Sequence, residues 1–290
     1  MGVVRIAGTV AQAEWRSLLR NRVARISSLL LLALTLAASL VSYEQMRAAN
    51  LERERFESTA DRHWNEQPER HPHRVVHYGH YVFRPLSALA FFDAGVLPFT
   101  GHTLFLEGHR QNSANFSEAV QSSVLLRFGQ LTPAFVLQVL TPLLIVFLAF
   151  GSAAREREQG QLRLLIAQGA SGATVLAGKL AAHALVALLL AVPALGALVA
   201  ISLVTPDVAG RAAWMALGYG TYLLLWSALA VLVSSCLPRA RDALLALAGC
   251  WIATVIVLPR VLPDVAARAR AAHTHRKRSG DCAGAQGNRR

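Results

Sequence analysis

Residues 132–154 read TPAFVLQVLTPLLIVFLAFGSAA, and residues 155–179 continue as REREQGQLRLLIAQGASGATVLAGK. The first stretch contains no Asp, Glu, Lys or Arg and is long enough to cross a bilayer core, which takes roughly 20 apolar residues. The second stretch is charged, contains several Gly and leads directly into another apolar run. This pattern predicts two membrane-spanning helices joined by a polar loop that holds a short amphipathic helix.

Similar apolar runs occur along the rest of the chain, which is 54% hydrophobic and has a mean hydropathy of +0.39. Five runs lack Asp, Glu, Lys and Arg: Ile26–Tyr43, Thr132–Ala154, Leu180–Val204, Ala212–Leu237 and Ala243–Leu258. The last is short, but it reaches Leu262 if Arg260 extends its charged end to the membrane surface. The sequence therefore predicts an all-α polytopic membrane protein with about five transmembrane helices.

The net charge of +12 comes mostly from basic residues that flank these runs, so we exclude a nucleic-acid partner and expect a lipid bilayer instead. Short loops rich in Lys and Arg remain in the cytoplasm. This rule places the N-terminus, residues 155–179 and residues 238–242 inside, with residues 44–131 outside. We therefore expect a multi-pass protein of the bacterial inner (cytoplasmic) membrane with a cytoplasmic N-terminus.

The charged segments suggest how the chain divides. Residues 1–25 are predicted to form a cytoplasmic amphipathic helix at the membrane surface. Residues 26–43 are predicted to form the first span. Residues 132–262 are predicted to form the remaining four spans together with the loop 155–179. Residues 44–131 predict an external, mainly helical and loop-rich domain. Its first helix continues from the membrane toward Pro68, and a second helix starts near Asn115, where a capping-box pattern occurs.

The loop 155–179 resembles the first cytoplasmic loop of ABC-2 type transporter permeases, which reads close to E-x-E-x-G-T-L-x-L-L followed by G-K. The matching positions, with Gln161 in place of the usual Thr, are Glu156, Glu158, Gly160, Leu162, Leu164, Leu165, Gly178 and Lys179. The step Glu14-Trp15-Arg16 is also similar to the start of many such permeases. The resemblance implies that the loop, with the N-terminal helix, contacts a separate ABC ATPase subunit.

Residues 44–131 contain, in order, Trp64-Asn65-Glu66-Gln67, His77-Tyr78-Gly79, Phe83-Arg84-Pro85 and Asp93-Ala94-Gly95-Val96. This order is similar to a bacterial subgroup of these permeases known as a domain of unknown function, DUF3526. Its pattern implies a further external stretch and a sixth span after residue 262. Residues 263–290 instead form a basic, Arg-rich segment without apolar periodicity. We therefore predict a C-terminal truncation or frameshift, with a disordered native tail as the alternative.

The chain has no phosphate-binding loop of its own. Residues 172–179 come close to G-x-x-x-x-G-K-[ST], but the spacing is one residue too long and Leu180 stands where Ser or Thr is needed. The resemblance implies a non-enzymatic permease subunit, in a homo- or heterodimer of permease chains, with ATP and Mg²⁺ bound by the partner ATPase. No cofactor is expected in this chain. His183, near the cytoplasmic end of its run, is expected to bond a backbone carbonyl.

Two other functions remain open. Residues 44–131 contain many His, and the weak metal candidates are His71, His73, His77 and His80. Imidazole is a common metal ligand, but Pro and Gly interrupt the stretch, so we expect hydrogen-bonding roles and no tight metal site. The alternatives to an exporter are therefore a membrane-anchored metal-binding protein and a non-transporting protein that acts on an external partner through residues 44–131.

Overall fold

The computed structural model describes residues 2–75, 77–97, 101–108, 131–262 and 265. Its elements are α1 (Val3–Arg20), α2 (Arg22–Asn65), α3 (Pro72–Val75), β1 (His80–Phe83), β2 (Thr103–Leu106), α6 (Pro133–Phe135), η2 (Val136–Leu140), α7 (Thr141–Ala149), α8 (Ala154–Glu158), α9 (Gln161–Ala167), α10 (Gly172–Val204), η3 (Pro206–Val208), α11 (Ala209–Cys236), α12 (Ala240–Trp251) and η4 (Ile252–Val257). The segments η2 and η4 are π-helical.

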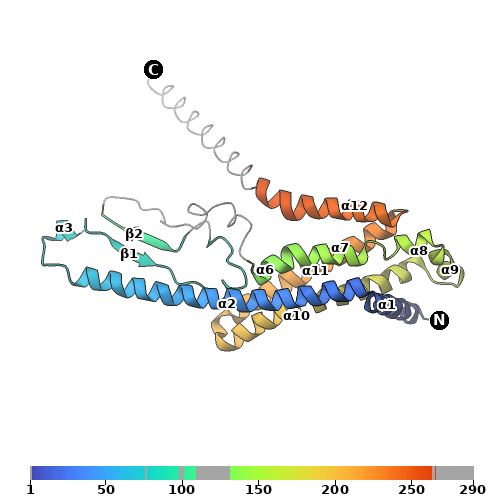
Figure 1. Cartoon of the computed structure of the whole chain (residues 1–290), viewed down its shortest axis with the longest axis horizontal. Coiled ribbons are helices and arrows are strands. Elements are labelled where there is room, and N and C mark those ends of the chain that lie inside the picture. Colours follow the sequence, from blue (N-terminus) through green and yellow to red (C-terminus); the bar gives the residue numbers. More distant parts are fainter. Residues whose placement is uncertain (1, 76, 98–100, 109–130, 263–264, 266–290) are drawn as a thin grey trace, which may run out of the picture.

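Five of the helices in the described residues are long and apolar enough to cross a membrane, and they run nearly side by side (Figure 1). They comprise Arg22–Asn65, Pro133–Glu158, Gly172–Val204, Pro206–Cys236 and Ala240–Leu262. Each apolar run of the sequence falls on one of them. The prediction of an all-α polytopic membrane protein is therefore confirmed, and the chain is a multi-pass membrane protein.

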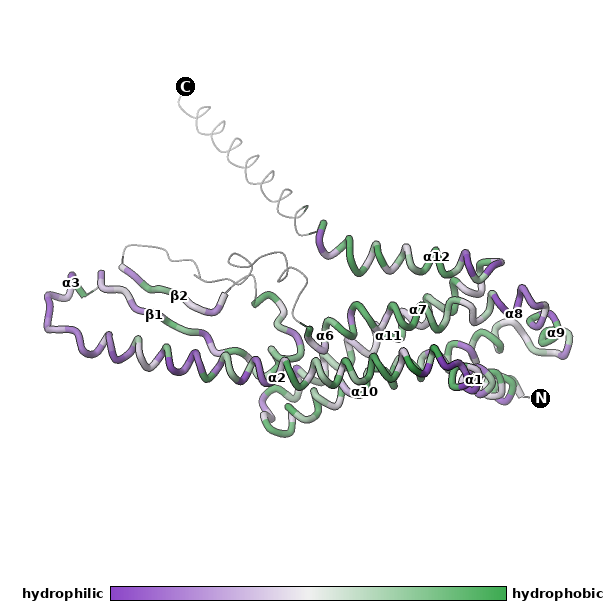
Figure 2. Tube along the Cα trace, viewed as in Figure 1, coloured by the Kyte–Doolittle hydropathy of each residue, from purple (hydrophilic) through white to green (hydrophobic). Residues whose placement is uncertain are grey.

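Helix α2 extends well beyond the apolar bundle. Its 44 residues span about 66 Å at 1.5 Å per residue, roughly twice the thickness of a bilayer core. The half after Tyr43 is hydrophilic, whereas the half beside α10 is hydrophobic (Figure 2). Asn21 starts the helix, because its side chain accepts hydrogen bonds from the backbone N–H groups of Val23 and Ala24.

An antiparallel pair of short strands lies along the hydrophilic half of α2 (Figure 1). Residue His80 of β1 is opposite Leu106 of β2, and Phe83 is opposite Thr103. Phe83 stacks on Phe56 of α2, with ring centroids 6.4 Å apart. The sequence-based expectation of a mainly helical and loop-rich region did not include this strand pair. Each strand has four residues, and its partner is distant in sequence, so no short hairpin pattern indicates the pair.

The connection between the strands lies at the end of the helical bundle where α6 begins. Asn50 holds this connection to α2, because its side chain accepts a hydrogen bond from the Leu86 N–H and donates one to the Leu86 carbonyl. Phe92 is fully buried, and its carbonyl accepts a hydrogen bond from Ala134 N at the start of α6. The segment between α2 and α6 is thus anchored to the second span. The helix predicted near Asn115 lies outside the described residues, as does nearly all of the tail.

The core lies where α10 packs against α11 and α7. Small buried residues, including Ala187, Ala191 and Ala194 of α10, allow the helices to approach closely. Helix α12 contributes little to this core. Its buried residues are Ala240, Ala243 and Leu247, all near its start. The later part of this fifth span therefore lies apart from the α10–α11 pair (Figure 1).

Candidate coupling site at the helix ends

Helix α1 crosses the start of α10 with almost no space between the two backbones. A Cβ atom on Gly178 would lie 2.5 Å from the Ala7 carbonyl oxygen and 2.8 Å from Val10 Cβ. Only Gly fits such a contact without movement of one helix. The half-buried residues of α1 lie on the side that faces α10, and they include Ala7, Val10 and Glu14.

This crossing buries an ion-pair cluster. Lys179 is only 1% exposed. Its Nζ donates hydrogen bonds to Glu14 Oε2 at 3.0 Å, to Glu156 Oε1 at 2.7 Å and to the Ser152 carbonyl oxygen at 2.7 Å. An ammonium group has three hydrogens, so all of its donors are used. The single Lys side chain therefore joins α1, α8 and the end of the second span.

Glu14 is held by two further groups. Ser152 Oγ donates to Glu14 Oε1 at 2.9 Å, and His183 Nε2 lies 3.2 Å from the same oxygen. Burial of Glu14 opposes ionisation, but the hydrogen bond with His183 and the positive charge of Lys179 outweigh it and lower the pKa of Glu14 from 4.5 to about 2. The resulting stability is complete above pH 4.5 and is lost as the pH falls through about 2. Glu14 is therefore ionised throughout the physiological range.

Helix α8 is also tied to the fourth and fifth spans. Arg157 donates to the carbonyl oxygens of Leu237 and Ser235 at the end of α11. Glu158 Oε1 accepts a hydrogen bond at 3.0 Å from Ala240 N, one of the N–H groups that the start of a helix leaves unpaired. Ser234 Oγ accepts hydrogen bonds from the N–H groups of Ala153 and Ala154. The short helix α8 thus contacts α10, α11 and α12 near this end of the bundle.

Helix α9 follows as an exposed helix of seven residues. Gly160 precedes it with φ +75°, and Gly169 follows it with φ +93°; both values favour Gly. Leu162 and Leu165 are half-buried, whereas Leu164 and Ile166 are 63% and 51% exposed. Helices α1, α8 and α9 lie together at the end of the molecule opposite the strands (Figure 1). Helix α9 thus exposes two apolar side chains near the ionic cluster.

The residues singled out in the sequence therefore separate into three groups. Glu156, Gly178, Lys179 and Glu14 meet in the cluster, while Glu158 caps α12. Leu162, Leu164 and Leu165 lie on α9, away from it. Trp15 is half-buried beside the cluster, and Arg16 is exposed. The expectation that His183 bonds a backbone carbonyl was wrong: its ring lies against the Glu14 carboxylate.

Two signals in the sequence could have revealed more of this cluster. Glu14 is the only acidic residue before Glu44, and it occurs in an otherwise basic helix. Lys179 and His183 are four residues apart and therefore share a helix face. Glu14, their common partner on α1, could not be predicted, because nothing in the sequence indicates which face of α10 packs against α1.

The four metal candidates do not gather at one point. His73 and His77 form an edge-on ring contact with centroids 5.1 Å apart. His71 Nδ1 accepts a hydrogen bond from His73 N, whereas His80 Nε2 lies 3.4 Å from Asp61 Oδ1. Within the part of the chain that the structure describes, no group of three or more His, Cys, Asp or Glu side chains has a metal-binding arrangement. Structural roles for these His residues remain a prediction.

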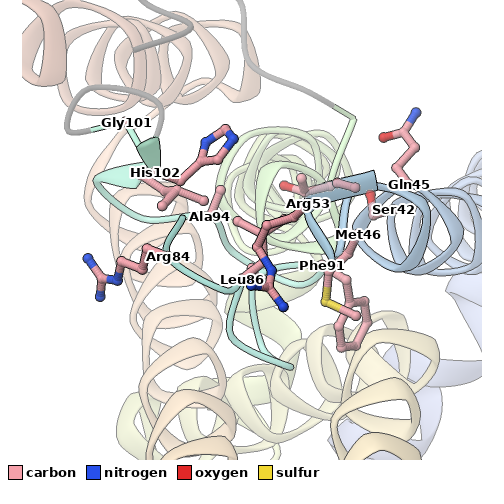
Figure 3. A pocket seen from close by; sticks show the side chains of 14 residues that line it. Ser42, Gln45, Met46, Arg53, Arg84, Leu86, Phe91, Ala94, Gly101 and His102 are labelled. Carbon is pink, nitrogen blue, oxygen red and sulfur yellow. The ribbon is translucent and has the colours of Figure 1, made fainter. Parts of the chain in front are cut away.

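A cavity of about 130 Å³ lies between the outer half of α2 and the connection between the strands. Figure 3 shows the side chain of Arg53 directed toward Leu86, whereas Arg84 extends away from Arg53. Arg53 already forms an ion pair with Glu57, with Nη1 to Oε2 at 2.6 Å. The positive charge of Arg53 is compensated by Glu57, and the Arg84 side chain is not directed toward Arg53. This cavity therefore lacks the paired positive groups that would bind an anionic ligand.

Comparison with known proteins agrees with the arrangement of spans and loop. The sequence profile of the ABC-2 family transporter proteins matches residues 8–277. The chain belongs to this family. It is thus a permease component of an ABC transporter. The matched region includes most of α1, all five spans and the loop 155–179. A search of curated proteins found no match.

The family also agrees with the lack of an ATP site in residues 172–179. These residues form the first two turns of α10, with Ser171 as the N-cap, and not a loop whose N–H groups surround phosphates. The permease therefore has no phosphate-binding loop at this position. The DUF3526 subgroup and the truncation remain predictions.

Proposed function

We propose that this permease is the membrane-spanning subunit of an ABC exporter and that a separate ATPase docks on α9. The observation that supports docking most directly is the exposure of Leu164 and Ile166 on a short helix outside the bundle. Single exposed apolar side chains are common on proteins, so the proposal also rests on the resemblance of the loop 155–179 to the loop that contacts the ATPase in ABC-2 permeases. In this proposal the ATPase binds ATP and Mg²⁺, and two permease chains pair with two ATPase subunits.

The contacts of α8 supply a route from the ATPase to the spans. A displacement of α9 moves α8, to which it is joined through Gly160. Helix α8 then acts on α1 and α10 through Glu156 and Lys179, and on α11 and α12 through Arg157 and Glu158. Because hydrogen bonds between charged groups are roughly twice as strong as neutral ones, we propose that α1, α8 and the nearby helix ends move as one unit.

The docking surface can be tested by changing Leu164 and Ile166 together to Asp. We expect the double variant to fold, since both side chains are exposed, but to lose co-purification with the ATPase encoded beside it and to lose stimulated ATP hydrolysis. The matched control changes Leu51 and Leu106, both 51% exposed, to Asp at the other end of the molecule. Undiminished ATPase binding by the α9 variant would contradict docking on this helix.

Charge reversal of Glu156 and Glu158 is a less direct test of docking. Glu156 pairs with Lys179, and Glu158 caps α12. Their replacement by Lys would disturb the permease itself, so a loss of binding would not separate docking from folding. The structure thus favours the α9 variant as the test of the contact.

We further propose that the strands and the outer half of α2 lie outside the inner membrane, with α1 in the cytoplasm. A Cys at Ser87, an exposed position, in a background without Cys236, Cys250 and Cys282, is expected to react with an impermeant maleimide in intact spheroplasts. A Cys at Gln168, which is exposed beside α9, should react only after lysis. The reverse labelling pattern would invert the proposed topology.

A further inference from the structure

A groove of about 750 Å³ lies between the second, fourth and fifth spans. This volume is within the range of roughly 300–1,000 Å³ that is usual for small-molecule sites. The side chains that line it are mainly apolar, with polar atoms from Gln138, Tyr219, Tyr222 and Thr254. No Asp, Glu, Lys, Arg or His is among the lining residues.

Both π-helical segments of the described chain contribute to this groove. Gln138 and Val139 belong to η2, and Thr254 and Val255 belong to η4. The Val139 carbonyl accepts a hydrogen bond from Trp251 Nε1 at 3.1 Å, which links the two spans beside the groove. Single π-helical turns within α-helices often occur at functional sites. Their joint presence here distinguishes this groove from the other surfaces of the bundle.

The hydroxyl groups in the groove donate hydrogen bonds to other groups of the protein. Tyr219 Oη donates to Asp93 Oδ2 at 2.7 Å, Tyr222 Oη donates to the Gln138 carbonyl at 2.8 Å, and Thr254 Oγ1 donates to the Cys250 carbonyl at 2.8 Å. A hydroxyl that donates its hydrogen still has lone pairs that accept. The Gln138 side chain gives one hydrogen to Tyr219, which leaves its second N–H hydrogen and its carbonyl oxygen. The groove therefore offers mainly acceptors to a ligand.

The hydrogen-bond network of these hydroxyl groups includes an acidic side chain, Asp93. Asp93 lies directly behind Tyr219 and accepts a second hydrogen bond, from Gly95 N at 2.8 Å. In a medium of low dielectric constant this carboxylate attracts a positive group and repels a negative one. Acceptors combined with a nearby negative charge select for a head group that donates hydrogen bonds, and an ammonium group most strongly.

We propose that this groove binds the permease's substrate, and that the substrate is a lipid-like amphiphile with an ammonium or hydroxyl head group that enters from the bilayer. The head group bonds Tyr222 and Gln138, and the chain lies along the apolar lining near Leu225, Leu229 and Val255. This inference rests on the proposed export function but names the substrate class and its site.

The first experiment compares two probes with the same chain on the full-length permease in phosphatidylcholine nanodiscs, without the ATPase. Radiolabelled dodecylamine is expected to bind saturably above the level of empty nanodiscs. Dodecanoate, whose head group is anionic and only accepts, is expected to bind at least about tenfold more weakly, the effect of losing one charged hydrogen bond. Equal binding of the two probes, or no saturable binding of either, would overturn the proposal.

The second experiment places the bound probe in the groove. A Cβ on Gly218 meets no atom within 4 Å, so Gly218→Phe directs a large ring into the groove; Gly196→Phe, on α10 and equally open at Cβ, is its control. Tyr222→Phe removes one acceptor, with Tyr43→Phe as its control. Both groove variants are expected to weaken dodecylamine binding about tenfold or more, while neither control changes it.

Other outcomes assign the groove differently. If Gly218→Phe changes only the association of two permease chains and leaves dodecylamine binding intact, the groove is an interface with a second copy and the proposal is wrong. If Gly218→Phe does not fold, the probe pair and Tyr222→Phe still decide the question. Because binding is measured without the ATPase, failure here is separate from failure of docking on α9.

Discussion

Replacement of Lys179 by Met is expected to destabilise the permease by up to about 3–5 kcal/mol, since it removes a buried cation and leaves two half-buried carboxylates without their shared partner. Glu14 and Glu156 would then face each other near the same point, with Ser152 and His183 as the remaining partners of Glu14. Thermal unfolding of the purified permease in nanodiscs measures the loss. We also expect stimulated ATP hydrolysis in the complex to become uncoupled from transport, because α1 no longer follows α8.

Two further variants establish the cause of this effect. Arg163→Met removes an exposed positive charge from the same loop and is expected to change stability by less than about 0.5 kcal/mol. The triple variant Lys179→Met, Glu14→Gln, Glu156→Gln removes all three charges and is expected to recover part of the loss, since no unpaired charge stays buried. If Lys179→Met and Arg163→Met behave alike, the cluster does not stabilise this end of the molecule.

Gly178→Ala is expected to displace α1 from α10 at a cost of about 1–3 kcal/mol, the usual range for an overpacked contact. The added Cβ would lie 2.5 Å from a backbone oxygen, which cannot rotate away as a side chain can. Movement of α1 also draws Glu14 from Lys179, so the steric and electrostatic effects reinforce each other. Trypsin cleavage after Arg16 and Arg20 in α1 measures the displaced population, because cleavage follows the open fraction when opening is fast.

Gly172→Ala is the matched control for this substitution. It makes the same change at the start of the same helix, where a Cβ meets nothing within 4 Å. There we expect no loss, or a gain of up to about 1 kcal/mol from the better helix propensity of Ala. Equal trypsin cleavage in the two variants would show that the crossing of α1 over α10 is looser than the structure indicates.

The sequence alone determined the spans, because membrane crossing depends on a local property. A run of about 20 apolar residues can satisfy its backbone only as a helix within a bilayer, so composition revealed all five. The extension of α2 beyond the membrane could also be predicted from the sequence, since the charged stretch after Tyr43 contains no Pro or Gly until Pro68. The loop residues were found through their resemblance to the family, although their roles within the fold were not.

Only the tertiary structure decided which charged groups meet. Glu14 and Lys179 are far apart in sequence, and each taken alone resembles a solvated residue at the end of a helix. Their pairing depends on the angle and depth at which α1 crosses α10, and these are set by Gly178 and the small side chains around it. The strand pair, the Tyr219–Asp93 contact and the groove have the same origin. They arise from long-range packing, which leaves no periodic signal in the sequence.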